Sequence, residues 1–215
     1  MSTNQRLSKG KNGMVVALAL LLVSCGGAAP SGSPIGGGPR YRTVRELLRG
    51  GDQPLPREQL LEIARFIRHW ERDPFLPTTP PNPEQTPSTM ALMLTWLAES
   101  PDVSVAMCPA TVTLAEEQAG EGAATGFLMG AGFGMAAYMI ENPAEAADPE
   151  GPRVQGAGLE SGLLWFEAYY ARNQARGAPI LEELVELRNE GGRAALQQYH
   201  ADHIRCGRHI GEPLP

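Results

Sequence analysis

The chain contains few of the residues that most often reveal a chemical function. Among its 215 residues are three cysteines and four histidines, and aromatic residues make up only 6%. No lysine follows Lys11, and acidic residues outnumber basic ones by 24 to 18. A chain with a net charge of −6 lacks the basic face that binds phosphate backbones, so we expect no nucleic-acid binding.

Sequence motifs of catalysis are missing as well. We find no nucleophile elbow of a serine hydrolase, no zinc-protease helix, no haem-attachment sequence and no phosphate-binding loop. These absences favour a protein that works by binding rather than by catalysis. The chain is instead rich in glycine, with 25 residues, and in proline, with 19, which indicates loops and closely packed backbone.

The N-terminal residues have the layout of an export signal. A polar, basic start with Arg6, Lys9 and Lys11 is followed by the apolar run MVVALALLLVS and then by Cys25. The apolar run is about ten residues long, which is too short for an ordinary transmembrane helix. The segment Leu22-Val23-Ser24-Cys25 resembles the lipobox of bacterial lipoprotein signal peptides, with an apolar residue at −3 and a small one at −1.

This resemblance implies cleavage before Cys25 and acylation of that cysteine, which would attach the protein to a membrane of the bacterial cell envelope. Gly26 stands where some bacteria place an aspartate that retains lipoproteins in the inner membrane, which favours the outer membrane. An ordinary cleaved signal with an incidental cysteine is the alternative. We therefore expect a signal peptide at 1–24, a lipidated cysteine with a flexible Gly/Pro/Ser tether at 25–41, and a folded domain at 42–215 facing the periplasm or the exterior.

Helical patterns dominate residues 42–215 and predict an all-α, irregular bundle of five or more helices. Two capping boxes, Thr43–Glu46 and Thr113–Glu116, mark expected helix starts, and the second helix is expected to run to about Glu141. Proline-rich residues 74–87 predict a loop, and Gly191-Gly192 predict a break before a last helix. Residues 103–107 alternate as in a short strand, although no partner strand is evident.

The uncharged segment 123–140 is long enough to span a membrane, yet acidic residues flank it on both sides and no Lys or Arg marks a cytoplasmic end. Small residues at four-residue spacing allow two helix backbones to approach closely. We predict a buried helical hairpin in which this segment packs on the helix near 158–175. The glycines expected at that contact are Gly122, Gly126, Gly130, Gly134, Gly158 and Gly162. The alternative is a membrane-active, oligomerising helix over 122–140.

Three cysteines become an even pair if Cys25 is acylated, and an oxidising compartment favours a disulfide between Cys108 and Cys206. The rival interpretations are a reactive thiol or a metal ligand. His200 and His203 share one face of the last expected helix, so with Cys206 or His209 they could hold a divalent metal. A solvated His-rich tail is the alternative, and otherwise we expect no cofactor.

Two further groups of side chains have both a chemical and a structural interpretation. Methionines on apolar helices suggest either soft-metal handling or core packing, and core packing is the commoner role; they are Met90, Met93, Met129, Met135 and Met139. Glu160 and Glu167 share a helix face, and Glu116 and Glu117 lie near a helix start. Such carboxylates either do acid–base chemistry or are simply solvated.

The sequence as a whole predicts a membrane-anchored lipoprotein whose helical domain binds a protein partner, in a scaffolding or envelope-assembly role. A metal-binding or metalloenzyme domain that uses the C-terminal histidines is one alternative. A membrane-active oligomer built on residues 122–140 is the other.

Overall fold

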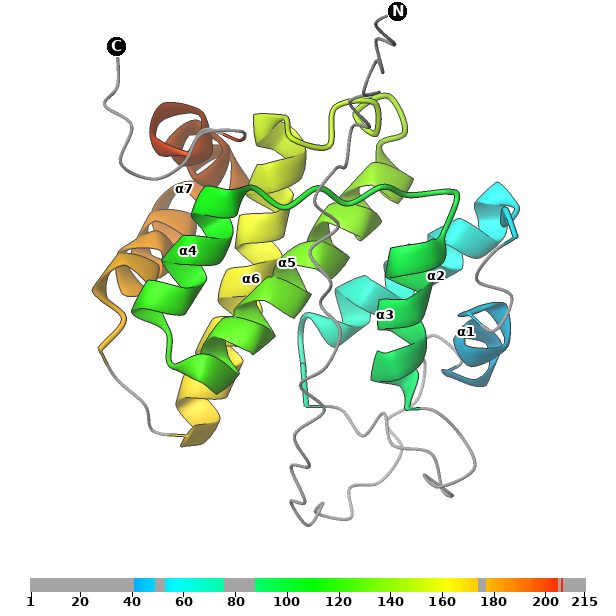
Figure 1. The fold of residues 1–215 in the computed structure, drawn as a ribbon, viewed down its shortest axis with the longest axis horizontal. Coiled ribbons are helices and arrows are strands. Elements are labelled where there is room, and N and C mark those ends of the chain that lie inside the picture. The colour runs from blue at the N-terminus through cyan, green and yellow to red at the C-terminus, as the bar shows by residue number, and fades with distance from the viewer. Residues whose placement is uncertain (1–40, 49–52, 76–87, 174–176, 205, 207–215) are drawn as a thin grey trace, which may run out of the picture. The chain divides into compact units, whose positions relative to one another are not determined.

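Seven α-helices make up the part of the chain that the structure, a computed structural model, describes. That part comprises residues 41–48, 53–75, 88–173, 177–204 and 206. The helices are α1 (Tyr41–Leu48), α2 (Arg57–Trp70), α3 (Thr89–Glu99), α4 (Pro109–Gln118), α5 (Glu121–Glu141), α6 (Pro152–Asn173) and α7 (Pro179–His203) (Figure 1). These residues contain no strand, so the predicted all-α fold is confirmed. The predicted signal peptide, residues 25–40 of the predicted tether, and His209 lie outside the described residues. Tyr41, expected as the last residue of the tether, is instead the first residue of α1.

Helices α5 and α6 form a hairpin that runs through the middle of the domain. Figure 1 shows them side by side, with α4 and α7 on one side and α1, α2 and α3 on the other. Helix α2 packs on α5, and α7 packs on α6. Each side of the hairpin has its own cluster of buried side chains, so the hairpin separates two hydrophobic cores.

The core beside α2 is built around aromatic rings. The ring of Trp70 at the end of α2 lies 5.3 Å from Trp165 of α6 and 5.6 Å from Phe133 of α5, measured between ring centroids. Phe66, one turn earlier in α2, lies 5.4 Å from Trp70. Buried aromatic groups each remove a large apolar area from water, so these rings fix α2 against both helices of the hairpin.

Glycine brings the two backbones of the hairpin together. A Cβ atom at Gly130 would lie 3.0 Å from the carbonyl oxygen of Ser161, and one at Gly134 would lie 2.8 Å from that of Ala157. The contact is reciprocal, because a Cβ atom at Gly158 or Gly162 would lie 3.2 Å from the carbonyl of Ala131 or 2.9 Å from that of Phe127. A side chain at any of these positions would push the helices apart, so the predicted close-packed hairpin is confirmed.

The prediction is wrong at Gly126. A Cβ atom built there would meet no atom within 4 Å, because this part of α5 faces a pocket rather than the backbone of α6. Gly122 faces the side chain of Tyr169, not the α6 backbone: its Cβ atom would lie 2.5 Å from the tyrosine oxygen. The close approach of the two backbones therefore extends from Phe127 and Gly162 to Gly134 and Ala157, and it does not include Gly122 or Gly126.

Several helix boundaries differ from the sequence prediction. The helix expected to start at Thr113 begins four residues earlier, at Pro109, and Thr113 Oγ1 donates a hydrogen bond back to the Pro109 carbonyl inside α4. That helix does not continue to Glu141, because the chain becomes extended at Ala119 and Gly120 before α5 begins. Residues 103–107 form no strand, since no partner strand lies among the described residues.

Helix α7 contains the predicted glycine break as a kink. Gly192 has φ 63° and ψ −158°, a backbone conformation that is open essentially to glycine alone. The helix resumes after it and reaches His203. Gly191-Gly192 therefore redirects the last turns of α7 instead of separating two helices by a loop.

One helix in the described part of the chain, Gly122–Glu141, is long and apolar enough to cross a membrane, with a mean hydropathy of 1.4. Of its most apolar 18-residue window, 78% is buried within the domain. Residues 131–140 of α5 are all buried. A core helix of a folded domain has these properties as well.

Candidate functional site

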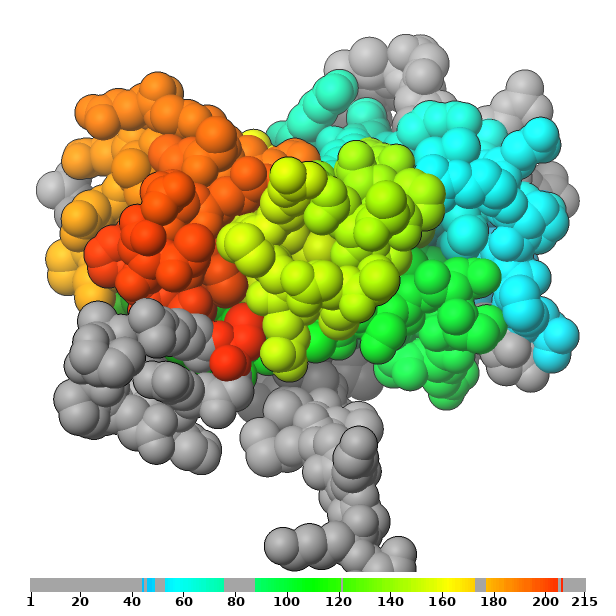
Figure 2. Space-filling model, turned by 90° about the horizontal axis from the view of Figure 1, so that it is seen from above, coloured from blue at the N-terminus to red at the C-terminus, as the bar shows by residue number. Residues whose placement is uncertain are grey.

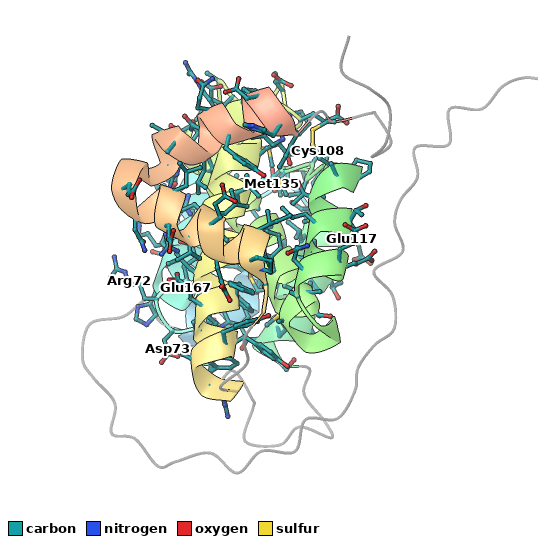
Figure 3. All side chains as sticks on the ribbon, turned by 90° about the vertical axis from the view of Figure 1, so that its left-hand side faces the viewer. Arg72, Asp73, Cys108, Glu117, Met135 and Glu167 are labelled. Atoms are coloured by element: carbon teal, nitrogen blue, oxygen red, sulfur yellow. A yellow bond between two sulfur atoms is a disulfide. The ribbon has the colours of Figure 1, made fainter. Side chains whose placement is uncertain are left out.

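The two cysteines of the folded domain meet at one end of the bundle. Cys108 and Cys206 are joined as a disulfide, with their Cα atoms 4.7 Å apart and a sequence separation of 98. Cys108 precedes α4 and Cys206 follows α7, so the bond connects these two helices. Figure 3 shows Cys108 beside the start of α4, next to the end of α7. The pairing expected from the sequence is the one that the structure contains.

Cys108 is held in place by its position at a helix start and by a side chain of α6. Its backbone carbonyl accepts the first hydrogen bonds of α4, from the amides of Thr111 and Val112. The buried amide of Gln155 donates to the carbonyl of Ala106, at 2.6 Å, and to that of Pro149, at 2.7 Å. Gln155 thereby ties the segment before Cys108 to the loop between α5 and α6.

His200, in the last turn of α7, points at both sulfur atoms. Its Nε2 lies 3.5 Å from Cys108 Sγ and 3.8 Å from Cys206 Sγ. The side chains of His200 and Cys108 are 3% and 1% exposed, and Cys206 is partly exposed. Burial lowers the pKa of His200, which keeps the imidazole neutral at neutral pH.

These three residues, Cys108, His200 and Cys206, are called the sulfur–imidazole cluster below. Their ligand atoms all lie within 4.8 Å of one another, and the described residues contain no second such group of three cysteine, histidine or carboxylate side chains. The Nδ1 atom of His200 is buried and finds no hydrogen-bond partner among the described residues. Figure 2 shows the end of α7, in red, against the yellow-green connection between α5 and α6.

The histidine pair expected from the sequence is not brought together as a ligand group. His203 is exposed, its Nδ1 lies 3.1 Å from the carbonyl oxygen of Tyr199, and its ring stacks on the Tyr199 ring at 4.6 Å. His200 faces the cysteines instead. Asp202 is exposed and accepts a hydrogen bond from Gln198. Of the predicted metal ligands, the structure therefore clusters His200 with Cys206, and His209 lies outside the described residues.

Two of the four candidate acid–base carboxylates, Glu160 and Glu167, have an arginine partner. Glu160 pairs with Arg193 at 2.5 Å, and Glu167 pairs with Arg188 at 2.7 Å, so both connect α6 to α7. Glu116 and Glu117 are exposed on α4, and Figure 3 shows Glu117 directed away from the bundle. Nothing in this arrangement brings two carboxylates to a common reacting position among the described residues.

Sequence reasoning missed a buried carboxylate at the end of α2. Glu71 is 8% exposed and lies 2.7 Å from Arg68, which also forms two hydrogen bonds with Glu141 at 2.8 and 3.1 Å. Burial raises the pKa of Glu71, and the positive charge of Arg68 lowers it by less. No sequence signal distinguished Glu71 from the exposed glutamates around it, because it follows the last periodic residue of α2.

An apolar pocket of about 190 Å³ opens where α3, α5 and α6 meet. It is lined by Pro74, Phe75, Met90, Gly122, Gly126, Met129, Trp165 and Tyr169. Gly126 has no side chain to fill the pocket, and a Cβ atom there would project into open space. Phe75 is one of two large apolar side chains in the described residues that are strongly exposed, at 41%, and the guanidinium of Arg172 lies 4.5 Å from its ring centroid.

The methionines divide between the core and this pocket. Met93, Met135 and Met139 are buried in the core beside α2, while Met90 and Met129 are partly exposed at the pocket. The Nε1 atom of Trp165 is buried and has no hydrogen-bond partner among the described residues. Sequence spacing could not reveal the pocket, because it depends on how three helices and the residues after α2 converge.

Comparisons with protein-family models, with curated proteins and with solved structures gave no match for this chain.

Proposed function

We propose that this chain is a lipid-anchored protein of a bacterial envelope whose helical domain binds an apolar side chain of a partner protein in the pocket between α3, α5 and α6. The anchor is Cys25, and the residues between it and α1 serve as the tether. The domain then acts by non-covalent binding, in a scaffolding or envelope-assembly role.

Two observations support the location. The segment Leu22-Val23-Ser24-Cys25 has the residue pattern of a lipobox, and an apolar run of export-signal length precedes it. The second observation is the disulfide between Cys108 and Cys206, because disulfides persist mainly outside the reducing cytosol. Both point to the same compartment from distant parts of the chain.

The pocket is the observation that carries the binding role. Small-molecule sites in proteins usually enclose about 300–1,000 Å³, so a pocket of about 190 Å³ suits one inserted side chain better than a whole ligand. Interfaces between proteins commonly depend on a few anchor side chains that fill such pockets. Its methionine and aromatic lining, with Phe75 exposed at the rim, favours an apolar or aromatic anchor.

Site-specific photo-cross-linking in the bacterium that carries the protein tests this proposal. A photoreactive phenylalanine analogue replaces Phe75 at the rim, and the matched control places it at Glu117, which is exposed on α4. We expect one discrete adduct with a different protein from position 75 and none from position 117. The variant Gly126→Leu, which fills the pocket, should abolish that adduct while the circular dichroism spectrum stays helical.

Four results would overturn the proposal. The first is the absence of any adduct from position 75, and the second is the same adduct from both positions. The third is an adduct with the mass of two copies of this chain, which would make the pocket a self-association site. The fourth is survival of the adduct in Gly126→Leu, which would mean that the partner binds at the rim and not in the pocket.

A further inference from the structure

His200 has no structural task at the disulfide. A disulfide needs neither a proton donor nor an acceptor, and an apolar side chain would fill the same buried space without the cost of burying a polar ring. His200 is nevertheless 3% exposed, directs Nε2 at both sulfur atoms, and leaves Nδ1 without a partner among the described residues. An imidazole in this position can bind the ligand that two thiolates also bind.

The distances in the cluster match those of a tetrahedral zinc site. Zinc–sulfur bonds of about 2.3 Å and zinc–nitrogen bonds of about 2.0–2.1 Å place a sulfur and a nitrogen ligand about 3.6 Å apart. In the structure, His200 Nε2 lies 3.5 Å from Cys108 Sγ and 3.8 Å from Cys206 Sγ. Once the disulfide is cleaved, the two sulfurs need only separate to about 3.8 Å, the spacing of two tetrahedral sulfur ligands.

We propose that the dithiol form of this protein binds Zn²⁺ through Cys108 Sγ, Cys206 Sγ and His200 Nε2, so that the disulfide and the metal are alternative links between α4 and α7. Two thiolates and one imidazole are the soft and borderline ligands that zinc prefers. These three ligands leave the fourth coordination position of the metal to water or to a substrate. The inference is independent of the pocket and of its partner.

A dithiol reductant converts the disulfide form of the protein into the dithiol form that binds zinc. A thiolate of the reductant attacks Cys206 Sγ, the more exposed sulfur, and Cys108 leaves as a thiolate. The second thiol of the reductant resolves the mixed disulfide, so the reductant is oxidised by two electrons to its own disulfide and the protein gains two thiols. Zn²⁺ then displaces the two thiol protons.

The surroundings favour the thiolate of Cys108. This residue is the N-cap of α4, a helix of ten residues, and the partial positive charge at a helix start stabilises a thiolate. Its side chain makes no capping hydrogen bond, so the sulfur is free to turn toward the metal. Gln155 donates to the carbonyl of Ala106 without contacting either sulfur, so we expect it to hold the preceding segment with either link.

The test uses the full chain with Cys25→Ser, so that Cys108 and Cys206 are its only thiols, kept in mild detergent. Co²⁺ serves as the optical probe, because thiolate ligation gives it an intense charge-transfer absorption. We expect the reduced protein to bind one equivalent of Co²⁺ with that absorption. Zn²⁺ should displace the Co²⁺ and raise the melting temperature of the reduced protein. The oxidised protein should neither bind Co²⁺ nor gain thermal stability from Zn²⁺.

A matched pair of variants assigns the third ligand. His200→Ala should weaken Co²⁺ binding by at least about tenfold, the lower end of what is lost even when a group that only hydrogen-bonds to a metal ligand is removed. His203→Ala, three residues away but exposed and stacked on Tyr199, should bind like the parent. The oxidised form of each variant reports whether it folds, by circular dichroism and melting temperature.

Four results would overturn the inference. They are no thiolate absorption in the reduced protein, equal binding by His200→Ala and the parent, equal loss in His203→Ala, and a reduced protein that stays unfolded when Zn²⁺ is present. Equal loss in both histidine variants would instead support a site on the exposed face of α7. None of these results bears on cross-linking from position 75.

Discussion

At Gly134 the absence of a single methyl group sets the distance between two helices. The carbonyl oxygen of Ala157 would lie 2.8 Å from a Cβ atom there, and a backbone oxygen cannot move aside as a side chain can. Gly126 lies two turns earlier on the same helix and has open space around it. Comparing substitutions at Gly134 and Gly126 therefore distinguishes the effect of close packing from the effect of glycine on helix formation itself.

We predict opposite stability changes for these two glycines. Gly134→Ala should lower the free energy of unfolding by about 2 kcal/mol, because an extra methyl forces backbone shifts in a packed core. Gly126→Ala should raise it by up to about 1 kcal/mol, because alanine is the better helix former where no clash occurs. Urea unfolding of both variants measures the difference, and equal effects would show that the hairpin contact is not tight.

The buried carboxylate of Glu71 should make stability depend on pH. Its pKa is raised in the folded state above the ordinary value of 4.5, chiefly by burial. A carboxyl group with a raised pKa in the folded state contributes its full stabilisation to the fold below its ordinary pKa. That contribution is lost as the pH rises through the pKa of the folded state. Glu71→Gln keeps the neutral form at every pH, so it should gain stability relative to the parent as the pH rises above 4.5.

Unfolding of Glu71→Gln and the parent in urea, at several pH values from 4 to 8, tests this expectation. Below 4.5 the difference between the two proteins should be constant, which serves as the internal reference. A difference that stays constant over the whole range would show that Glu71 has its ordinary pKa in the folded protein. A difference that changes in favour of the parent would reverse the assigned sign.

At the scale of elements, the sequence predicts helices well and their exact ends less well. In α2 the buried Ile63, Ile67 and Trp70 recur at helical spacing, and Ser88 caps α3 by accepting a hydrogen bond from the Ala91 amide. The capping box at Thr113 was misleading, because Pro109 offers an equally good first turn and the extended chain at Gly120 ends α4. Local signals compete, and tertiary packing selects among them.

The candidate sites were less predictable than the helices. The disulfide partners followed from counting cysteines, but the direction of His200 depends on the kink at Gly192 and on where α4 begins. Helical spacing grouped His200 with His203, whereas the fold groups it with residues 92 positions earlier and six positions later. Contacts between distant segments are invisible to a periodicity argument.

The link between α4 and α7 should contribute strongly to stability. The double variant Cys108→Ala/Cys206→Ala removes a bond that closes a loop with a sequence separation of 98 residues. Chain-entropy arguments put the contribution of such a loop at about 4–5 kcal/mol. Urea unfolding with a chelator present should show a loss of that size relative to the oxidised parent, and a loss under about 1 kcal/mol would contradict it.

For the whole molecule, the hairpin of α5 and α6 is a shared wall between two hydrophobic cores. Within it, the glycine face of α5 contacts α6, and other faces of α5 contact α2 on one side and α4 on the other. Outside the part that lines the pocket, most of α5 is therefore covered by other helices and is not exposed to lipid or to a second copy. Membrane insertion of α5 would require both cores to open first.

We therefore predict that the lipid is the membrane attachment of this protein. Residues 34–215, which contain all seven helices, should be monomeric in buffer without detergent, because 78% of the most apolar window of α5 is buried. Sedimentation should give a single species of monomer mass, and vesicles loaded with dye should not leak when the protein is added. Oligomers, a need for detergent, or leakage would show that α5 leaves the core, and the membrane-active alternative would then replace the envelope-anchored binding domain. The full chain with intact Cys25 should bind the same vesicles once it is acylated, because several buried acyl chains give stable anchoring.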